Sequence, residues 1–505
     1  MLKSIKISLK ESAIYGLGNI AVKIVGLILI PIYTNKEYFS VDEFGIYAIL
    51  EICGLVLTSV MASALPQSLT RWFWDKDHRE NQKGIFFMSL TTQLVVSLIF
   101  CLILIPLSGS LSQMIFSNTN WGQALVLVIL ASSIQSVNNI INTLMRLQTR
   151  SFLYSVTNLL KLLIVLSLTL YFVLVKRRGI EGIFLAQVIG NAIIVLILTG
   201  YTLKNIKPFF DRTIFSSMSA YGFPLLLANI SAVALTVIDK FSLQSMAVLK
   251  SVALYTLANK ITSVLKLVIV DSMKLALGPM MIKRIENPDN KRFYSKALLY
   301  SSYILMFAII PVSLFSFELI RLLPGAEEYI GAVTIIPVLA LSVFFVNMKE
   351  VTVYGLHIAK KTNIIGFIVA GATIFALVLN ILLIPRWDIT GAAIATLSAQ
   401  FIYWFACYYF SQRVFYVPYE LRKIVLILIV GAGLSFSSLL LNGLDLFPRL
   451  LLKTICVISF PFILYLFRFY EPVELQVIRG FITKWSKLKD FRANLKSLKG
   501  ITDEF

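Results

Sequence analysis

The sequence predicts an all-α polytopic membrane protein, and three observations support this fold class. Of the 505 residues, 58% are hydrophobic and only 14% are charged, whereas soluble chains carry about 25% charged residues. The mean hydropathy is +0.83. Uncharged runs recur along the whole chain, and many reach the roughly 20 residues that a membrane-spanning helix requires.

Fourteen apolar runs are long enough to be predicted as spanning helices. They lie near residues 13–33, 44–64, 85–108, 122–144, 152–175, 180–203, 218–238, 251–273, 297–318, 331–356, 363–385, 389–411, 424–441 and 450–467. The first run is too long for a removable signal peptide and lacks a small-residue cleavage site. An even number of spans places both termini on the same side of the membrane.

The basic residues indicate which side that is. If the N-terminus is cytoplasmic, the inner loops and both terminal segments hold 31 Lys and Arg residues, and the outer loops hold eight. Positive residues accumulate on the cytoplasmic side, so we expect cytoplasmic N- and C-termini. The formal net charge of +20 then reflects topology and contact with anionic lipid headgroups. Membrane lipids are therefore expected partners, and nucleic acid is not.

The chain also repeats itself at a nearly constant interval. Matching positions are Tyr15 and Tyr221, Tyr47 and Tyr255, and Gly182 and Gly391, which are 206, 208 and 209 residues apart. Six spans lie in each copy, so the copies share one orientation, as in transporters that rock between two states. The predicted units are an N-lobe with spans 1–6 (residues 1–212), a C-lobe with spans 7–12 (213–415), spans 13 and 14 (416–470) and a tail (471–505).

The tail has a pattern of its own. Apolar residues recur in it at three- and four-residue steps, with lysines between them. This pattern predicts a basic amphipathic helix on the cytoplasmic membrane surface.

Ionisable side chains inside the spans are the candidate functional residues, because such charges face a bundle interior or a water-filled cavity. The deep basic residues would make a cationic cavity that suits a strongly anionic group such as pyrophosphate. These candidates are Lys23, Lys161, Lys260 and Lys266. The alternative is that each lysine pairs with a carboxylate, for example Lys23 with Glu51, or extends to an interface.

Two acidic residues, Asp239 and Glu51, are candidates to bind Na⁺ or H⁺ and so couple transport to an ion gradient; structural pairing is the alternative. No cofactor and no enzyme activity are predicted. The sequence contains no GxxxxGK[ST], HExxH or GxSxG motif. Its two histidines and four cysteines, the latter all in apolar runs, suggest no metal site.

Four segments carry a resemblance to a known family. They are "SAIYGLGNIAVKIVGLILIPIYTNKEYFSVDEFGIYAIL" (12–50), "ALPQSLTRWFWDKDHRE" (64–80), "YGFPLLLANISAVALTVIDKFSL" (221–243) and "LVLNILLIPRWDITGAAIATLSAQ" (377–400). Together they resemble polysaccharide (O-antigen type) flippases of the multidrug/oligosaccharidyl-lipid/polysaccharide exporter superfamily, over about residues 10–415. Arg71, which aromatic residues follow in the second segment, joins the candidates for substrate binding.

The resemblance implies two six-helix lobes around a central cavity, with alternating access. It implies movement of undecaprenyl-pyrophosphate-linked oligosaccharide from the inner to the outer leaflet of a bacterial inner (cytoplasmic) membrane, by antiport with H⁺ or Na⁺. Basic cavity residues would hold the pyrophosphate, and the lipid tail would lie along a seam between the lobes. The lipid-linked oligosaccharide is the expected ligand, with glycan polymerase and ligase proteins as further candidate partners.

Three alternatives remain. Lipid II (peptidoglycan precursor) flippases of the same superfamily also have fourteen spans, but characteristically carry arginines in the first spans and in span 8, where this chain has Lys23, Lys260 and Lys266. A multidrug extruder would meet repulsion between a cationic cavity and cationic substrates. A non-transporting scaffold of a glycan-synthesis complex needs neither a duplicated bundle nor buried charges.

Overall fold

The structure is a computed structural model that describes residues 28–75, 81–283, 290–359 and 361–476. Every regular element in these ranges is helical. The elements are α2 (Ile30–Tyr33), α3 (Val41–Ala62), α4 (Leu65–Phe73), α5 (Gln82–Leu104), α6 (Ser108–Phe116), α7 (Gly122–Leu147), α8 (Ser151–Leu170), η2 (Tyr171–Val175), α9 (Gly179–Lys204), α10 (Arg212–Met246), α11 (Leu249–Leu265), η3 (Lys266–Asp271), α12 (Ser272–Lys283), α13 (Asn290–Leu314), α14 (Ser316–Arg321), α15 (Ala326–Tyr329), η4 (Ile330–Thr334), α16 (Ile336–Thr352), α17 (Tyr354–Ile358), α18 (Thr362–Val414), α19 (Leu421–Leu441) and α20 (Leu446–Leu466).

Twelve helices of the described ranges are long and apolar enough to cross a membrane, so the chain is a multi-pass membrane protein. One of them, α18, has 53 residues, which corresponds to about 80 Å of helix against a hydrocarbon core of about 30 Å. It is interrupted at Asp388, where φ is 47° and ψ is −127°. A Cβ at Gly391 would lie 2.4 Å from the Leu383 carbonyl oxygen, so the chain folds back there. Helix α18 therefore contains the predicted eleventh and twelfth spans.

The prediction of fourteen spans differs from these twelve helices for two reasons. Two predicted spans are joined in α18, as the interruption at Asp388 shows. The predicted first span, near 13–33, lies outside the described residues except for its last six, which include α2. The remaining predicted spans each correspond to one of the candidate helices.

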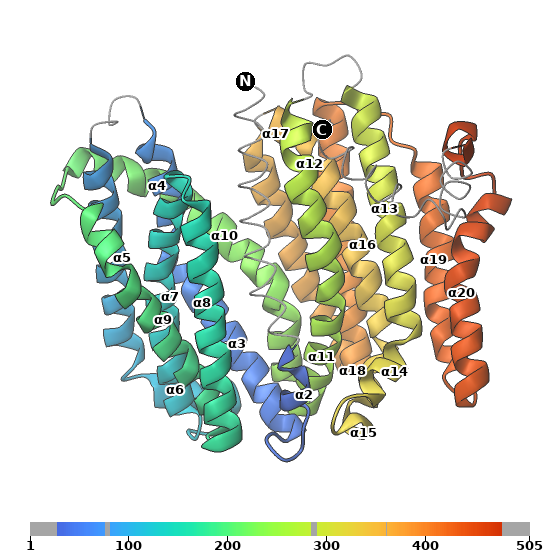
Figure 1. The fold of residues 1–505 in the computed structure, drawn as a ribbon, viewed down its shortest axis with the longest axis horizontal. Helices are drawn as coiled ribbons and strands as arrows, with labels where there is room; N and C mark the ends of the chain where they lie inside the picture. Colours follow the sequence, from blue (N-terminus) through green and yellow to red (C-terminus); the bar gives the residue numbers. More distant parts are fainter. Residues whose placement is uncertain (1–27, 76–80, 284–289, 360, 477–505) are drawn as a thin grey trace, which may run out of the picture.

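Two helical bundles lie side by side (Figure 1). In the first bundle, α7 packs against α3, α5 and α9. In the second bundle, α16 packs against α11, α13 and α18. Helices α7 and α16 are the most buried candidate spans of their bundles. They are the fourth and tenth predicted spans, so equivalent members of the sequence repeat occupy equivalent places.

Helix α10 belongs to both bundles. Near its beginning, Ile214 and Met218 are part of the buried apolar cluster of the first bundle, and the Ser68 hydroxyl donates to the Met218 carbonyl oxygen at 3.0 Å. Farther along, α10 packs against α18, where the Thr373 hydroxyl donates to the Ser231 carbonyl oxygen at 3.1 Å. The division predicted at residues 212/213 thus falls at the start of a helix that connects the bundles.

The bundles meet at one end, the closed end, and separate toward the other, the open end (Figure 1). At the closed end one buried apolar cluster includes Phe44 and Tyr47 of the first bundle and Tyr255 of the second. The backbones of the two bundles also come into contact at this end, since a Cβ at Gly45 would lie 2.5 Å from the Leu249 carbonyl oxygen. Side chains and backbone of both bundles therefore seal this end.

Helices α19 and α20 pack on the outside of the second bundle, against α13. On α20, Lys453 is fully buried and lies 2.7 Å from a Glu318 carboxylate oxygen. The guanidinium of Arg449 lies 2.8 Å from the other Glu318 oxygen. A buried charge requires such partners, so this cluster fixes the position of α20 against α14.

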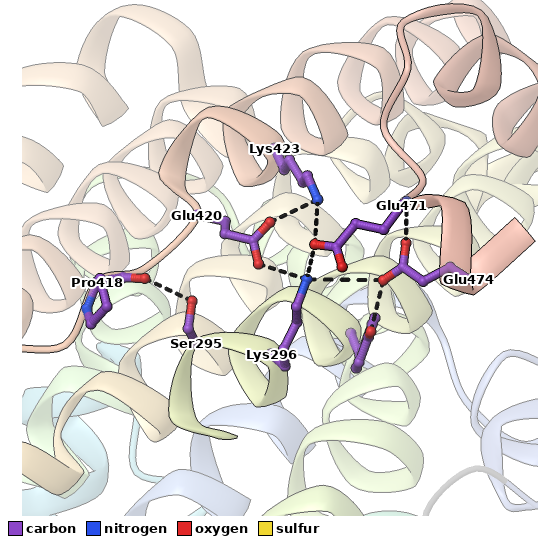
Figure 2. Close-up of polar contacts among 8 residues, drawn as sticks. Ser295, Lys296, Pro418, Glu420, Lys423, Glu471 and Glu474 are labelled. Atoms are coloured by element: carbon purple, nitrogen blue, oxygen red, sulfur yellow. Dashed lines mark hydrogen bonds and ion pairs between the residues drawn. The ribbon is translucent and has the colours of Figure 1, made fainter. Parts of the chain in front are cut away.

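The chain that follows α20 is held at the open end by a second charged cluster, formed with α13 and α19 (Figure 2). The Lys296 ammonium lies 2.8 Å from Glu420 and 2.5 Å from Glu471. The Lys423 ammonium bridges the same two carboxylates at 2.7 and 3.3 Å. The predicted tail helix begins here, and its residues from 477 onward lie outside the described ranges.

Candidate functional site

A cavity of about 1220 Å³ lies between the two bundles. It exceeds the range of roughly 300–1,000 Å³ found for small-molecule sites. Its walls come from α3, α4, α7, α8 and α9 of the first bundle, and from α10, η3 and α12. The lining runs from Glu51, beside the closed-end cluster, to Arg146 and Lys274 near the open end.

Helix α7 presents a polar stripe to this cavity. Gln135, Asn139, Asn142 and Arg146 all line it, and their spacing of four, three and four residues places them on one helix face. The stripe is about 17 Å long at the helical rise of 1.5 Å per residue. The Gln135 amide donates to the Asn139 side-chain oxygen at 2.8 Å.

Helices α8 and α9 extend the same wall. Asn158 and Lys161 of α8 and Gln187 and Asn191 of α9 line the cavity. The Lys161 ammonium donates to the side-chain oxygen of Gln135. Asn191 is 4% exposed, and its side-chain oxygen has no hydrogen-bond partner among the described atoms. Polar groups thus face the cavity from three neighbouring helices.

Positive charge on this wall comes from Arg146 and Lys161. The Arg146 guanidinium donates to the Thr143 hydroxyl at 3.0 Å, and the partner of Lys161 is a neutral amide. Within the described ranges neither side chain forms an ion pair, whereas Lys274 on the facing wall lies 2.9 Å from Glu350. Arg146 and Lys161 are therefore the lining cations best placed to receive an anion.

An ion pair connects the bundles where the cavity meets the closed end. The Lys260 ammonium on α11 lies 3.1 Å from both carboxylate oxygens of Glu51 on α3. The Tyr47 hydroxyl donates to Glu51 at 2.9 Å, and Lys260 lies 5.4 Å from the centre of the Tyr47 ring. The sequence also allows Lys23 as a partner of Glu51; Lys23 lies outside the described residues.

Asp239 is buried in the second bundle, away from the cavity lining. Its carboxylate accepts hydrogen bonds from Tyr255, Asn380 and Thr396 at 2.9, 2.9 and 2.8 Å. The side-chain oxygen of Asn380 has no partner among the described atoms. A carboxylate whose hydrogen-bond partners are neutral oxygen-bearing side chains can take up a proton or a hard cation, which prefers oxygen ligands.

A second cavity, of about 370 Å³, is almost entirely apolar. Residues of α3, α10 and α18, such as Val60, Phe241 and Leu377, line it. Ser59 and Val233 line both this groove and the polar cavity. The apolar groove and the polar cavity are therefore adjacent.

The structure separates the residues that the sequence groups as one site. Lys161 lines the polar cavity, and Lys260 lies just beyond the lining, in its ion pair. Arg71 and Lys266 are exposed and do not belong to the lining that the structure describes. These four predicted basic residues thus do not converge on one point in this conformation, and the fifth, Lys23, lies outside the described residues.

The sequence reasoning considered only charged residues and missed the amide stripe. A signal was present in the fourth span, where "QSVNNIINTLMR" (135–146) places polar residues at helical spacing inside an apolar run. Amides are less costly in a membrane than charges, yet they also lie preferentially between helices. Arg146 lies beyond the predicted end of the fourth span, at residue 144, although it belongs to the last turn of α7.

Sequence comparison gives two findings. A model of a family described as polysaccharide biosynthesis protein matches residues 38–332. An uncharacterized membrane protein of Methanocaldococcus jannaschii is 24% identical over 457 residues, which cover 84% of this chain and 89% of that protein.

Several solved structures have a similar fold. The lipid II flippase MurJ in an inward closed conformation superposes with a TM-score of 0.74 at 13% identity, covering 89% of this chain and 98% of that chain. An inward-facing multidrug resistance MATE transporter of the MOP superfamily gives 0.62 at 14% identity, with coverage of 82% and 95%. A MOP superfamily transporter from Pyrococcus furiosus gives 0.57 at 13% identity, with coverage of 83% and 96%. The chain therefore has the fold of this superfamily.

Proposed function

Because this chain belongs to the polysaccharide biosynthesis protein family, we propose that it is a flippase for undecaprenyl-pyrophosphate-linked oligosaccharide. It moves this lipid from the inner to the outer leaflet by alternating access. The observation that carries the proposal is the polar cavity of about 1220 Å³ between two bundles. A pyrophosphate with several sugars needs a large site with many polar groups, and an apolar bilayer offers none.

The pyrophosphate is assigned to Lys161, and Arg146, near the open end, is assigned to receiving it on entry. Both line the cavity and have only neutral hydrogen-bond partners among the described residues. An anion can therefore bind them without displacing a carboxylate. The other basic candidates, Lys23, Lys260, Lys266 and Arg71, contribute in conformations that bring them to the cavity.

The isoprenoid tail is assigned to the apolar groove beside the cavity. The groove shares Ser59 and Val233 with the polar cavity, so one molecule can place its headgroup in one and the first part of its tail in the other. Apolar surface is stabilised by contact with a hydrocarbon chain, as it is by lipid.

The open end is assigned to the cytoplasm, with both termini on that side, in a bacterial cytoplasmic membrane. The distribution of Lys and Arg supports this orientation. The headgroup then enters from the inner leaflet. Release on the other side requires the closed-end cluster around Phe44 and Tyr255 to separate.

Coupling to H⁺ or Na⁺ is assigned to Asp239, with Glu51 as the second candidate. The three hydrogen bonds to Asp239 come from α11 and from both halves of α18. Uptake of a cation would change contacts among three spans at once, which is what a coupling site must do. Glu51 lies between the bundles and is already paired with Lys260.

Transport of lipid II is the second candidate function. The TM-score of 0.74 to a lipid II flippase, with 98% of that chain covered, favours it. The lysines at positions 23, 260 and 266, where that branch characteristically carries arginines, favour an oligosaccharide lipid instead.

Mass spectrometry of lipid-linked glycans from cells that lack the gene tests the proposal. We expect undecaprenyl-pyrophosphate oligosaccharide to accumulate, and expect the wild-type gene to reverse this. Lys161→Gln should fail to reverse it although the protein inserts at a normal level. The matched control is Lys250→Gln, at an exposed position on α11. Accumulation of lipid II would select the second candidate, and no accumulation in cells without another flippase would contradict both. Transport by the purified protein in proteoliposomes would exclude a scaffold or a partner-dependent role.

A further inference from the structure

The wall formed by the first bundle contains more neutral polar groups than a pyrophosphate site needs. Six amide side chains of α7, α8 and α9 line the cavity: Gln135, Asn139, Asn142, Asn158, Gln187 and Asn191. The facing wall, from α10, η3 and α12, contributes one amide, Asn229; its other lining residues are Thr236, Asp271, Lys274 and the apolar Ala232, Val233 and Leu267. The wall formed by the first bundle is thus much richer in amides than the facing wall.

Several of these amides have unused hydrogen-bonding capacity. Asn142 and Gln187 are half-buried, and their side-chain amides make no hydrogen bond within the described part of the chain. Asn191 is 96% buried, and its side-chain oxygen is unpartnered there. Buried polar groups without partners are unfavourable. A lining of this kind is therefore expected to exchange hydrogen bonds with whatever fills the cavity.

An amide presents two donors and an acceptor with two lone pairs, and a hydroxyl group can both donate and accept. A row of hydroxyl-rich, uncharged units therefore matches a row of amides. A ligand with several carboxylates would instead require additional cations on the same wall. Among the described residues this wall has two cationic side chains, Arg146 and Lys161, and both are assigned to the pyrophosphate.

We propose that the amide wall, defined as these six side chains, recognises the sugars of the transported lipid and that these sugars are predominantly uncharged. This inference rests on the proposed function. The stripe on α7 places the sugars along about 17 Å of helix, between Gln135 beside Lys161 and Arg146 at the open end. Specificity for the glycan is then a property of the first bundle.

The test measures binding to purified protein in nanodiscs by native mass spectrometry. Two probes are compared: undecaprenyl pyrophosphate without sugar, and the same lipid carrying a chain of four N-acetylglucosamine units. We expect the wild type to bind the sugar-bearing lipid at least about tenfold more tightly, because several hydrogen bonds each contribute a factor of about two to ten. The double variant Asn142→Leu, Gln187→Met keeps side-chain volume and should reduce the ratio of the two affinities by about five- to fiftyfold.

The ratio does not depend on the fraction of protein that is correctly folded, so partial misfolding does not imitate the effect. Gln113→Met, at an exposed position of α6 near the closed end, is the matched control and should retain the wild-type ratio. An unchanged ratio in the double variant would overturn the amide wall while leaving the flippase assignment intact. If the wild type binds neither lipid, the flippase assignment fails and the inference fails with it.

Discussion

The Lys260 ammonium on α11 lies 3.1 Å from each carboxylate oxygen of Glu51 on α3. Helix α3 belongs to the first bundle and α11 to the second, so this pair holds the bundles together next to the cavity. The Glu51 side chain is 40% exposed and that of Lys260 is 15% exposed. Any movement that opens the closed end must separate these charges or transfer Lys260 to another anion.

Glu51→Gln should destabilise the described conformation, because it leaves the largely buried Lys260 side chain without its carboxylate partner. We expect a loss of about 1–3 kcal/mol. Thermal unfolding in detergent measures it, in a double-mutant cycle with Lys260→Gln. A coupling energy near zero would contradict the role of this pair in connecting the bundles.

Gly45→Ala should weaken closure of the closed end. The added Cβ would lie 2.5 Å from the backbone oxygen of Leu249, so the two helices must move apart. Gly54→Ala on the same helix is the control, because its Cβ would meet only ordinary contacts, at 3.4 Å and beyond.

The readout is cross-linking between cysteines at positions 36 and 328, whose native side chains form an ion pair of 2.9 Å at the closed end. Gly45→Ala should lower the cross-linking yield several-fold. Equal yields in both variants would show that the contact at Gly45 does not control closure.

Asp239→Asn should uncouple transport from the ion gradient. The asparagine keeps the shape of the side chain and one of its two acceptor oxygens, but it removes the charge that a proton or sodium ion would neutralise. Transport in proteoliposomes is compared with and without imposed H⁺ and Na⁺ gradients. Asp445→Asn, at an exposed position before α20, is the control. Gradient-dependent transport by Asp239→Asn would exclude this residue as the coupling site.

The charged cluster in Figure 2 should respond to acid. Burial alone would raise the pKa of Glu420, but hydrogen bonds and charges of Lys296 and Lys423 lower it below its ordinary 4.5. The hydrogen bond from Lys296 likewise lowers the pKa of Glu471. A carboxylate with a lowered pKa stabilises the folded state above its ordinary pKa, and this contribution is lost as the pH falls through the lowered value.

Residues 471–476 should therefore stay attached to α13 and α19 at neutral pH and detach only below about pH 4.5, the ordinary carboxylate value. Hydrogen exchange of these amides as a function of pH measures this. Lys296→Met should cause faster exchange already at pH 7. If acid and this substitution both leave exchange unchanged, the cluster does not hold the segment.

The sequence predicts the membrane fold well because the hydrophobic period and length of a span are local properties. Thirteen of the fourteen predicted spans correspond to helices of the described ranges. The joining of two spans at Asp388 is not predictable in this way, since a tight reversal keeps both segments helical almost to the turn. Nor does hydropathy reveal that Ile214 and Met218 of α10 pack in the first bundle.

The site was harder to predict than the fold. Charge in a span identified Lys161, Glu51 and Asp239 as unusual, but it gave no information about which cavity or partner each faces. The Glu51–Lys260 pair joins residues 209 positions apart, and only the packing of α3 on α11 brings them together. Asn142 and Gln187 line the cavity. They carry no charge, so a search for charged residues inside spans does not identify them.

The shared helix α10 also determines how the bundles can move. Its first turns are fixed to the first bundle through Ser68 and Met218, and its later turns are fixed to α18. Between these attachments lies Pro224, which cannot donate a backbone hydrogen bond and so makes the helix easiest to bend there. A change of angle between the bundles would therefore bend this continuous helix at Pro224. Two halves connected in this way cannot drift apart in the bilayer.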